Sequence, residues 1–179
     1  MLQALALFSA SLKKVRALLL MTLGLAACQN QGAAISKLDD ILSGNASMSE
    51  FSMYYTEEHP MDWMLSFSLT GKSGFAHIVK KKMKTGCQAH WDSNCWQTTE
   101  KTRAISDEDT RLIIQFLASS KLVHANGNQV LAPGSEGVSL NISLPDIEPV
   151  KFRAKLQAFS SDPQLGELRR LILKLSEEI

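Results

Sequence analysis

The sequence predicts an α+β domain of two layers, an antiparallel sheet with helices packed on one face, in the order ββ(β)αββα. In several separate segments, apolar and polar residues alternate with a period of two, which is typical of strands with one buried and one solvated face. Two other segments have helical periodicity, and short turns join successive strands. A chain of 179 residues, 45% of them hydrophobic, is long enough to bury one such core.

The first strands are predicted between residues 50 and 84. The segment that begins at Glu50 alternates, and so does 63–70, where the residues facing one way are Trp63, Leu65, Phe67 and Leu69. The turn 71–74 contains two glycines, which can adopt positive φ, so 75–84 returns as the second arm of a hairpin. Ahead of these strands, residues 35–42 predict one or two helical turns.

Two helices follow from capping signals. Ser106 is an N-cap with Asp109 at the capping-box position, and the predicted buried stripe is Leu112, Ile113, Phe116 and Leu117. Asp162 and Pro163 begin the last helix in the favoured order of cap and first turn. Its apolar face is Leu165, Leu168, Leu171, Ile172 and Leu175.

Between the helices, a loop over 124–137 leads into two more strands. In 138–144 the alternating apolar residues are Val138, Leu140, Ile142 and Leu144. The second strand is predicted over 150–158, with its outward positions at Lys151, Arg153, Lys155 and Gln157. All these elements form a single domain over residues 50–179.

The N-terminal segment has the order of an export signal. Lys13, Lys14 and Arg16 form a basic region, an apolar stretch covers 17–25, and two small residues precede Cys28. The stretch is shorter than the roughly 20 residues of a spanning helix. Because residues 1–11 put apolar side chains ahead of the basic region, we expect translation to start at Leu12, read from an alternative start codon.

The residues Leu25-Ala26-Ala27-Cys28 resemble the lipobox of bacterial lipoproteins. The resemblance implies that residues 1–27 are a signal peptide, that the Cys28 sulfur is acylated, and that 28–49 is the lipidated N-terminus and tether. Two or more acyl chains anchor a protein stably. Gln29 stands where an Asp would retain the protein in the inner membrane, which implies the periplasmic side of the outer membrane in a Gram-negative cell.

The arrangement over 50–179 is similar to that of small lipid-anchored α+β envelope proteins, a resemblance of pattern that brings no catalytic residues with it. Lipidation of Cys28 would leave Cys87 and Cys95 as the remaining thiols. Outside the cytoplasm, such a pair predicts a disulfide that closes the aromatic loop 86–96. In the chain-entropy model, this bond stabilises the fold by about 2.5 kcal/mol.

No motif assigns a catalytic residue, a metal site or a cofactor. Cys87, His90 and Cys95 could act as ligands, but the seven residues between the cysteines are unlike the close pairs of structural zinc sites. No nucleophile elbow or phosphate loop is present. An enzyme or metal-dependent sensor that uses the Cys87–Cys95 loop is the alternative to a non-enzymatic protein.

Two candidate binding surfaces remain. Lys80, Lys81, Lys82 and Lys84 lie on one strand, and if that strand neighbours Lys151, Arg153 and Lys155, the open face of the sheet is cationic. The second surface is formed by Trp91 and Trp96, which either bind a partner or cover the end of the sheet.

The candidate partners are an envelope protein and an anionic envelope polymer, besides the membrane at Cys28. A net charge of +1 gives no signal for nucleic acid.

Overall fold

The computed structural model describes residues 32–60, 62–87, 92–120, 131–132 and 135–177. It confirms the α+β class, because six antiparallel strands form one sheet in the order β4-β3-β2-β1-β5-β6. The strands are β1 (Ser52–His59), β2 (Trp63–Thr70), β3 (Phe75–Met83), β4 (Trp96–Ala104), β5 (Gly137–Ser143) and β6 (Val150–Lys155). The helices are residues 32–43, α2 (Asp107–Ser119), α4 (Leu156–Ser161) and α5 (Pro163–Glu177).

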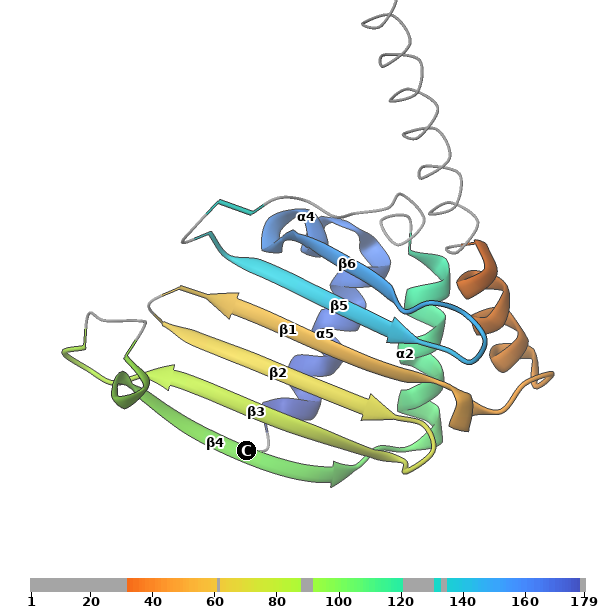
Figure 1. The fold of residues 1–179 in the computed structure, drawn as a ribbon, viewed down its shortest axis with the longest axis horizontal. Coiled ribbons are helices and arrows are strands. Elements are labelled where there is room, and N and C mark those ends of the chain that lie inside the picture. Colours follow the sequence, from red (N-terminus) through yellow and green to blue (C-terminus); the bar gives the residue numbers. More distant parts are fainter. Residues whose placement is uncertain (1–31, 61, 88–91, 121–130, 133–134, 178–179) are drawn as a thin grey trace, which may run out of the picture.

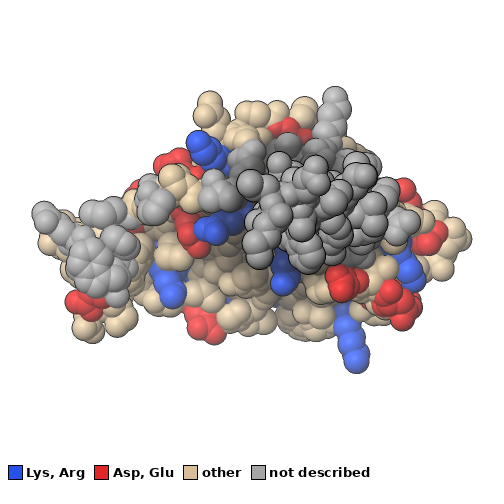
Figure 2. Space-filling view, turned by 45° about the horizontal axis from the view of Figure 1, so that its top comes forward, with Lys and Arg blue, Asp and Glu red and all other residues tan. Residues whose placement is uncertain are grey.

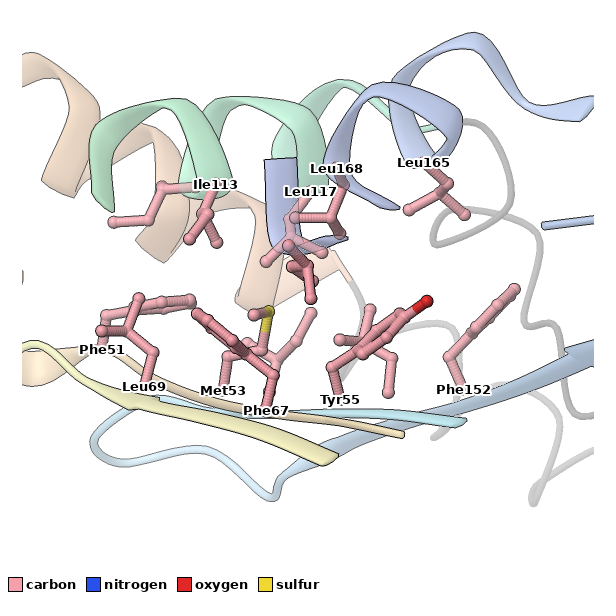
Figure 3. Packing of buried hydrophobic residues seen from close by; sticks show 14 of the residues in the cluster. Phe51, Met53, Tyr55, Phe67, Leu69, Ile113, Leu117, Phe152, Leu165 and Leu168 are labelled. Atoms are coloured by element: carbon pink, nitrogen blue, oxygen red, sulfur yellow. The ribbon is translucent and has the colours of Figure 1, made fainter. Parts of the chain in front are cut away.

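The core lies between one face of the sheet and the helices (Figure 3). The inward side chains of Phe67 and Leu140, in two of the central strands, are at most 2% exposed. Leu117 of α2 and Leu168 of α5 close the core from the helical side and are fully buried. The predicted alternation in β1, β2 and β5 therefore gives the inward face correctly, because burying that face is the main driving force for folding.

Two glycines shape the end of the sheet where β2 turns into β3. Gly74 has φ +63°, a backbone conformation that residues with a side chain rarely adopt. This conformation allows the predicted hairpin turn. Gly71 is required for a different reason. A Cβ there would lie 1.8 Å from the carbonyl oxygen of Met48, so the close approach of the preceding turn excludes any side chain.

Strand β4 was not predicted from the sequence. Its residues are almost all exposed, so no alternation of apolar side chains marks it. It is an edge strand that pairs only with β3, in a register that sets Val79 opposite Glu100. The β-branched residues Thr98, Thr99 and Thr102 are the one local signal, because threonine favours extended backbone.

The predicted strand over 150–158 is too long. β6 ends at Lys155, and α4 begins at Leu156, so Gln157 does not continue the outward row of side chains. Phe159 of α4 is fully buried and contacts the rings of Tyr55 and Phe152. This contact favours a helical turn where the local pattern alone predicts continued strand.

The predicted helices begin where the capping signals place them. Ser106 Oγ accepts a hydrogen bond from the Asp109 amide at 3.0 Å, and Asp162 Oδ1 accepts from the Leu165 amide at 3.0 Å. The face of α5 is largely as predicted, with Leu171 only partly buried. In α2 the buried stripe is centred on Ile113, Ile114 and Leu117, and the predicted Leu112 and Phe116 lie at its rim.

The folded domain begins ahead of residue 50. Residues 32–43 form a helix rather than one or two turns, and its side chains Ala34, Leu38 and Ile41 are at most 3% exposed. This helix packs at the end of the helical layer beside α2 (Figure 1). From residue 32 on, the segment expected to be a tether therefore belongs to the core.

Candidate functional site

The sheet has one face that no described helix covers (Figure 1). Its side chains come from the outward positions of all six strands and are mostly polar, with Ser66, Ser68 and Ser139 in the central strands. Two aromatic rings interrupt this surface. Tyr54 of β1 is 49% exposed and Phe75 of β3 is 50% exposed, the two large hydrophobic side chains exposed among the described residues.

A shallow pocket of about 260 Å³ lies on this face, where β1, β5 and β6 run side by side. Antiparallel register places Asn141 directly between Tyr54 on one neighbouring strand and Lys151 on the other. Arg153 and Ser139 form the next pair along the same two strands and also line the pocket. The pocket thus combines an aromatic ring, two cations and two neutral polar groups.

The polar groups of this pocket are incompletely paired. Asn141 Oδ1 is buried and accepts no hydrogen bond within the structure, which is uncommon for a buried amide oxygen. Among the described residues, no carboxylate forms an ion pair with Lys151 or Arg153. The arrangement can therefore accept an anion and a hydrogen-bond donor together.

The predicted outward positions of Lys151, Arg153 and Lys155 are confirmed, since all three alternate with buried residues in β6. The condition for one continuous cationic face, that these cations adjoin the lysines of β3, is not met. Three strands, β2, β1 and β5, separate β3 from β6. Figure 2 shows acidic and basic side chains interspersed on the face it presents.

The lysines of β3 also divide between the two faces of the sheet. Lys81 points to the open face, whereas Lys80 points toward the helices, and its Nζ donates a hydrogen bond to the carbonyl of Ser176. Arg103 of β4 donates to the carbonyl of Leu175 at 3.0 Å. Both cations thus satisfy carbonyls in the last turn of α5, where the helix dipole favours positive charge.

Cys87 and Cys95 form the disulfide expected for this pair, with a Cα–Cα distance of 5.6 Å. The bond joins the end of β3 to the start of β4, and Cys95 is 7% exposed. Both sulfurs are used in this bond. No group of three metal-binding side chains occurs within the residues described, and His90 lies outside them.

Trp96 is half-buried at the first position of β4 and lies opposite Met83. Trp91 lies outside the described residues, so a surface formed by the two tryptophans stays a prediction. Four strands separate β4 from β6, and the structure therefore does not bring Trp96 together with Lys151 and Arg153. Cys28 and Gln29 also lie outside the described residues.

A buried charged cluster on the opposite face was not predicted from the sequence. Glu57 of β1 is 0% exposed, and its carboxylate accepts hydrogen bonds from Arg169 Nε at 2.9 Å and Nη2 at 2.7 Å. Tyr55 Oη donates to Glu57 Oε2 at 2.5 Å. His59 Nε2 lies 2.8 Å from Glu57 Oε1, and its Nδ1 lies 3.1 Å from Glu136 Oε1.

The environment of this cluster shifts three pKa values. Burial raises the pKa of Glu57, but hydrogen bonds from Arg169, Tyr55 and His59 outweigh it and hold that pKa below its ordinary value. The hydrogen bond to Glu57 raises the pKa of Arg169. Burial, together with the adjacent Glu57 charge, raises the pKa of the Tyr55 hydroxyl. Glu57 and Arg169 are therefore both charged at neutral pH.

The chemistry of the cluster is structural in character. Every oxygen of the Glu57 carboxylate is paired, so neither oxygen has a lone pair directed at a substrate pocket, and the pocket described above lies on the other face of the sheet. The cluster ties α5 to β1 across the two layers. The alternation Tyr55-Glu57-His59 places three polar groups at inward positions of one strand, a signal that a sequence pattern could have revealed.

No family model, curated protein or solved structure matches the chain. Among the described residues, none of the helices is both long enough and apolar enough to span a membrane.

Proposed function

We propose that this chain is a non-enzymatic, lipid-anchored protein of the cell envelope whose domain binds an anionic envelope polymer. The observation that carries the binding role is the sheet face that no described helix covers. On it, Lys151 and Arg153 line a pocket and form no ion pair with a described carboxylate. A face that is bare, polar and locally cationic attracts a polyanion.

The anchoring role is supported by the lipobox-like residues 25–28 and by their position relative to the fold. Residue 32, four positions after Cys28, already lies in a helix packed into the core. A signal that ends just ahead of a folded domain suits a protein held at a bilayer by acyl chains on its first residue. Gln29 in the next position favours the outer membrane, facing the periplasm, in a Gram-negative cell.

Replacing the candidate lipidated residue tests the anchor. In Cys28→Ala, we expect the protein to lose incorporation of a labelled fatty acid, to keep the mass of an unacylated chain and to leave the membrane fraction. Two acyl chains bind a membrane far more tightly than one, so a protein without them should lose nearly all of its membrane association. A Cys28→Ala protein that still fractionates with membranes, unmodified in mass, would contradict the anchor.

Charge reversal of Lys151, Arg153 and Lys155 to glutamate tests the binding role. We expect salt-sensitive co-sedimentation with isolated peptidoglycan sacculi or lipopolysaccharide to be lost, because three attractions become repulsions. Reversal of three exposed cations away from the open face changes the net charge equally and is the matched control. These control positions are Lys72, Arg111 and Lys174.

Equal loss in both triple variants would show that net charge alone causes the attraction, and the open face would then have no binding role. If the polymer does not bind at low salt but a protein crosslinks reproducibly to this face, the proposed occupant is wrong and an envelope protein takes its place. In the disulfide, the sulfurs of Cys87 and Cys95 are bonded to each other, and this does not favour the metal-dependent alternative.

A further inference from the structure

We propose that the pocket between β1, β5 and β6 binds a sugar ring that carries an acidic group. This inference deepens the proposed function, on which it rests, by naming the unit of the polymer that the site recognises. Three features meet in this pocket: the ring of Tyr54, the amide of Asn141 and the cations Lys151 and Arg153.

The cations define the charge of the ligand. Lys151 and Arg153 are two residues apart on β6 and project from the same face, so both can reach one anionic group. Neither forms an ion pair with a described carboxylate. A guanidinium binds a carboxylate or phosphate through two parallel hydrogen bonds, which gives the site a preferred orientation for the acid.

The amide of Asn141 defines a second requirement. Its buried Oδ1 has no partner in the structure, and a buried acceptor of this kind is normally satisfied by a donor. A simple anion such as inorganic phosphate at neutral pH supplies mainly acceptors. A hydroxyl group next to the acid can pair with the side-chain amide of Asn141, which lines the pocket, so the ligand is a hydroxylated anion rather than a bare ion.

The ring of Tyr54 defines the third requirement. Its hydroxyl lies 3.4 Å from Ser66 Oγ on β2, and its ring lines the pocket with half of its surface exposed. An exposed aromatic face beside polar groups favours a ligand with one apolar face and polar edges. A pyranose has this shape, with C–H groups on its faces and hydroxyls around its rim. The pocket volume of about 260 Å³ suits one such ring rather than a larger ligand.

The test uses the purified full chain in detergent micelles and measures binding by calorimetry and by amide chemical shifts. The probes are trigalacturonic acid, glucose 6-phosphate, the neutral sugar maltotriose and inorganic phosphate. We expect at least one acidic sugar to bind and to shift the amides of the pocket, while maltotriose and phosphate bind at least about tenfold more weakly. Binding of the uronate alone indicates a carboxylate as the acidic group, and binding of the sugar phosphate alone indicates a phosphate.

Each feature of the pocket has a matched control variant. Tyr54→Ala should weaken binding about tenfold, whereas Phe75→Ala, which removes the other exposed ring of the same face, should leave it unchanged. Lys151→Gln should weaken it by about the same factor. Lys155→Gln, on the same strand and face but outside the pocket lining, should not.

The proposal is overturned if neither acidic sugar binds, if phosphate binds as tightly as they do, or if Tyr54→Ala and Phe75→Ala behave alike. Failure here is distinguishable from failure of the proposed function. If charge reversal on β6 still abolishes binding to sacculi or lipopolysaccharide while no acidic sugar binds, the binding role of the face stands and its ligand class is wrong.

Discussion

At the scale of single residues, Glu57 shows how a polar side chain can be fully buried in a sheet. Desolvation of a carboxylate is costly, and the four hydrogen bonds it accepts offset that cost. Its main partner, Arg169, lies 112 residues further along the chain. No local pattern identifies such a partner, and none predicts that His59, with only 15% of its side chain exposed, belongs to the same cluster.

Removing the arginine of this cluster should destabilise the domain strongly. We expect Arg169→Met to lower the free energy of unfolding by about 3–5 kcal/mol, because it leaves a buried carboxylate without its main partner. Arg170→Met is the matched control on the same helix, since Arg170 is 71% exposed and its pair with Glu167 lies at the surface. That change should cost at most about 0.5 kcal/mol. Similar denaturant midpoints for the two variants would contradict a structural role for the cluster.

The same cluster predicts a dependence of stability on acid. Because the pKa of Glu57 is lower in the folded chain than the ordinary 4.5, the folded state favours the carboxylate, and its contribution is fully present above that pH. It is lost as the pH falls through the depressed folded pKa. Below about pH 4.5, the free energy of unfolding of the wild type should therefore fall more steeply with decreasing pH than that of Glu57→Gln. Parallel curves for the two proteins would show that Glu57 contributes nothing to the acid response.

At the scale of elements, local chemistry accounts for most of what was predicted correctly. Alternation marks strands with a buried face, and Ser106 and Asp162 mark helix starts because their side chains bond orphan amides. The same reasoning fails for β4, whose stability comes from backbone pairing with β3 rather than from burial. It also fails at Leu156, where packing of Phe159 decides that the strand ends and a helix begins.

The disulfide should matter most for this edge hairpin. It closes a loop of nine residues between β3 and β4, and the Lys84 amide donates to the Cys95 carbonyl at 2.8 Å beside it. We expect Cys87→Ser with Cys95→Ser to lower the free energy of unfolding by about 2.5 kcal/mol in the chain-entropy model. Thermal unfolding of the wild type with and without a reductant should show a shift that the double variant lacks. A reductant effect of equal size in both proteins would exclude this bond as its cause.

At the scale of the whole molecule, the start of the fold constrains where the domain sits. Residue 32 already belongs to a helix packed on the core, and three residues separate it from Cys28, so the two Cα atoms lie at most about 14 Å apart. Under the proposed anchoring, the domain stays close to the bilayer rather than extending from it on a long tether.

This closeness can be measured by energy transfer. A donor dye on Ser36→Cys, an exposed position of the first helix, should transfer efficiently to an acceptor on lipid head groups. Insertion of ten Gly/Ser residues between Gln31 and Gly32 should reduce that transfer, because such a linker adds roughly 15–20 Å of mean reach. Transfer that is unchanged by the insertion would mean that the domain rests on the membrane for reasons other than its short connection.

The sequence by itself determined the class of the fold, the inward face of most strands, the starts of both capped helices and the expected disulfide, since these depend on interactions between residues close along the chain. Only the tertiary structure decided the order of the strands, the presence of β4 and the two sites on opposite faces of β1. Strand order separates Lys151 from the lysines of β3 and brings it beside Asn141 and Tyr54. The physical reason is that pairing between distant strands and compensation of buried charge are cooperative properties of the packed chain, which no local pattern of residues encodes.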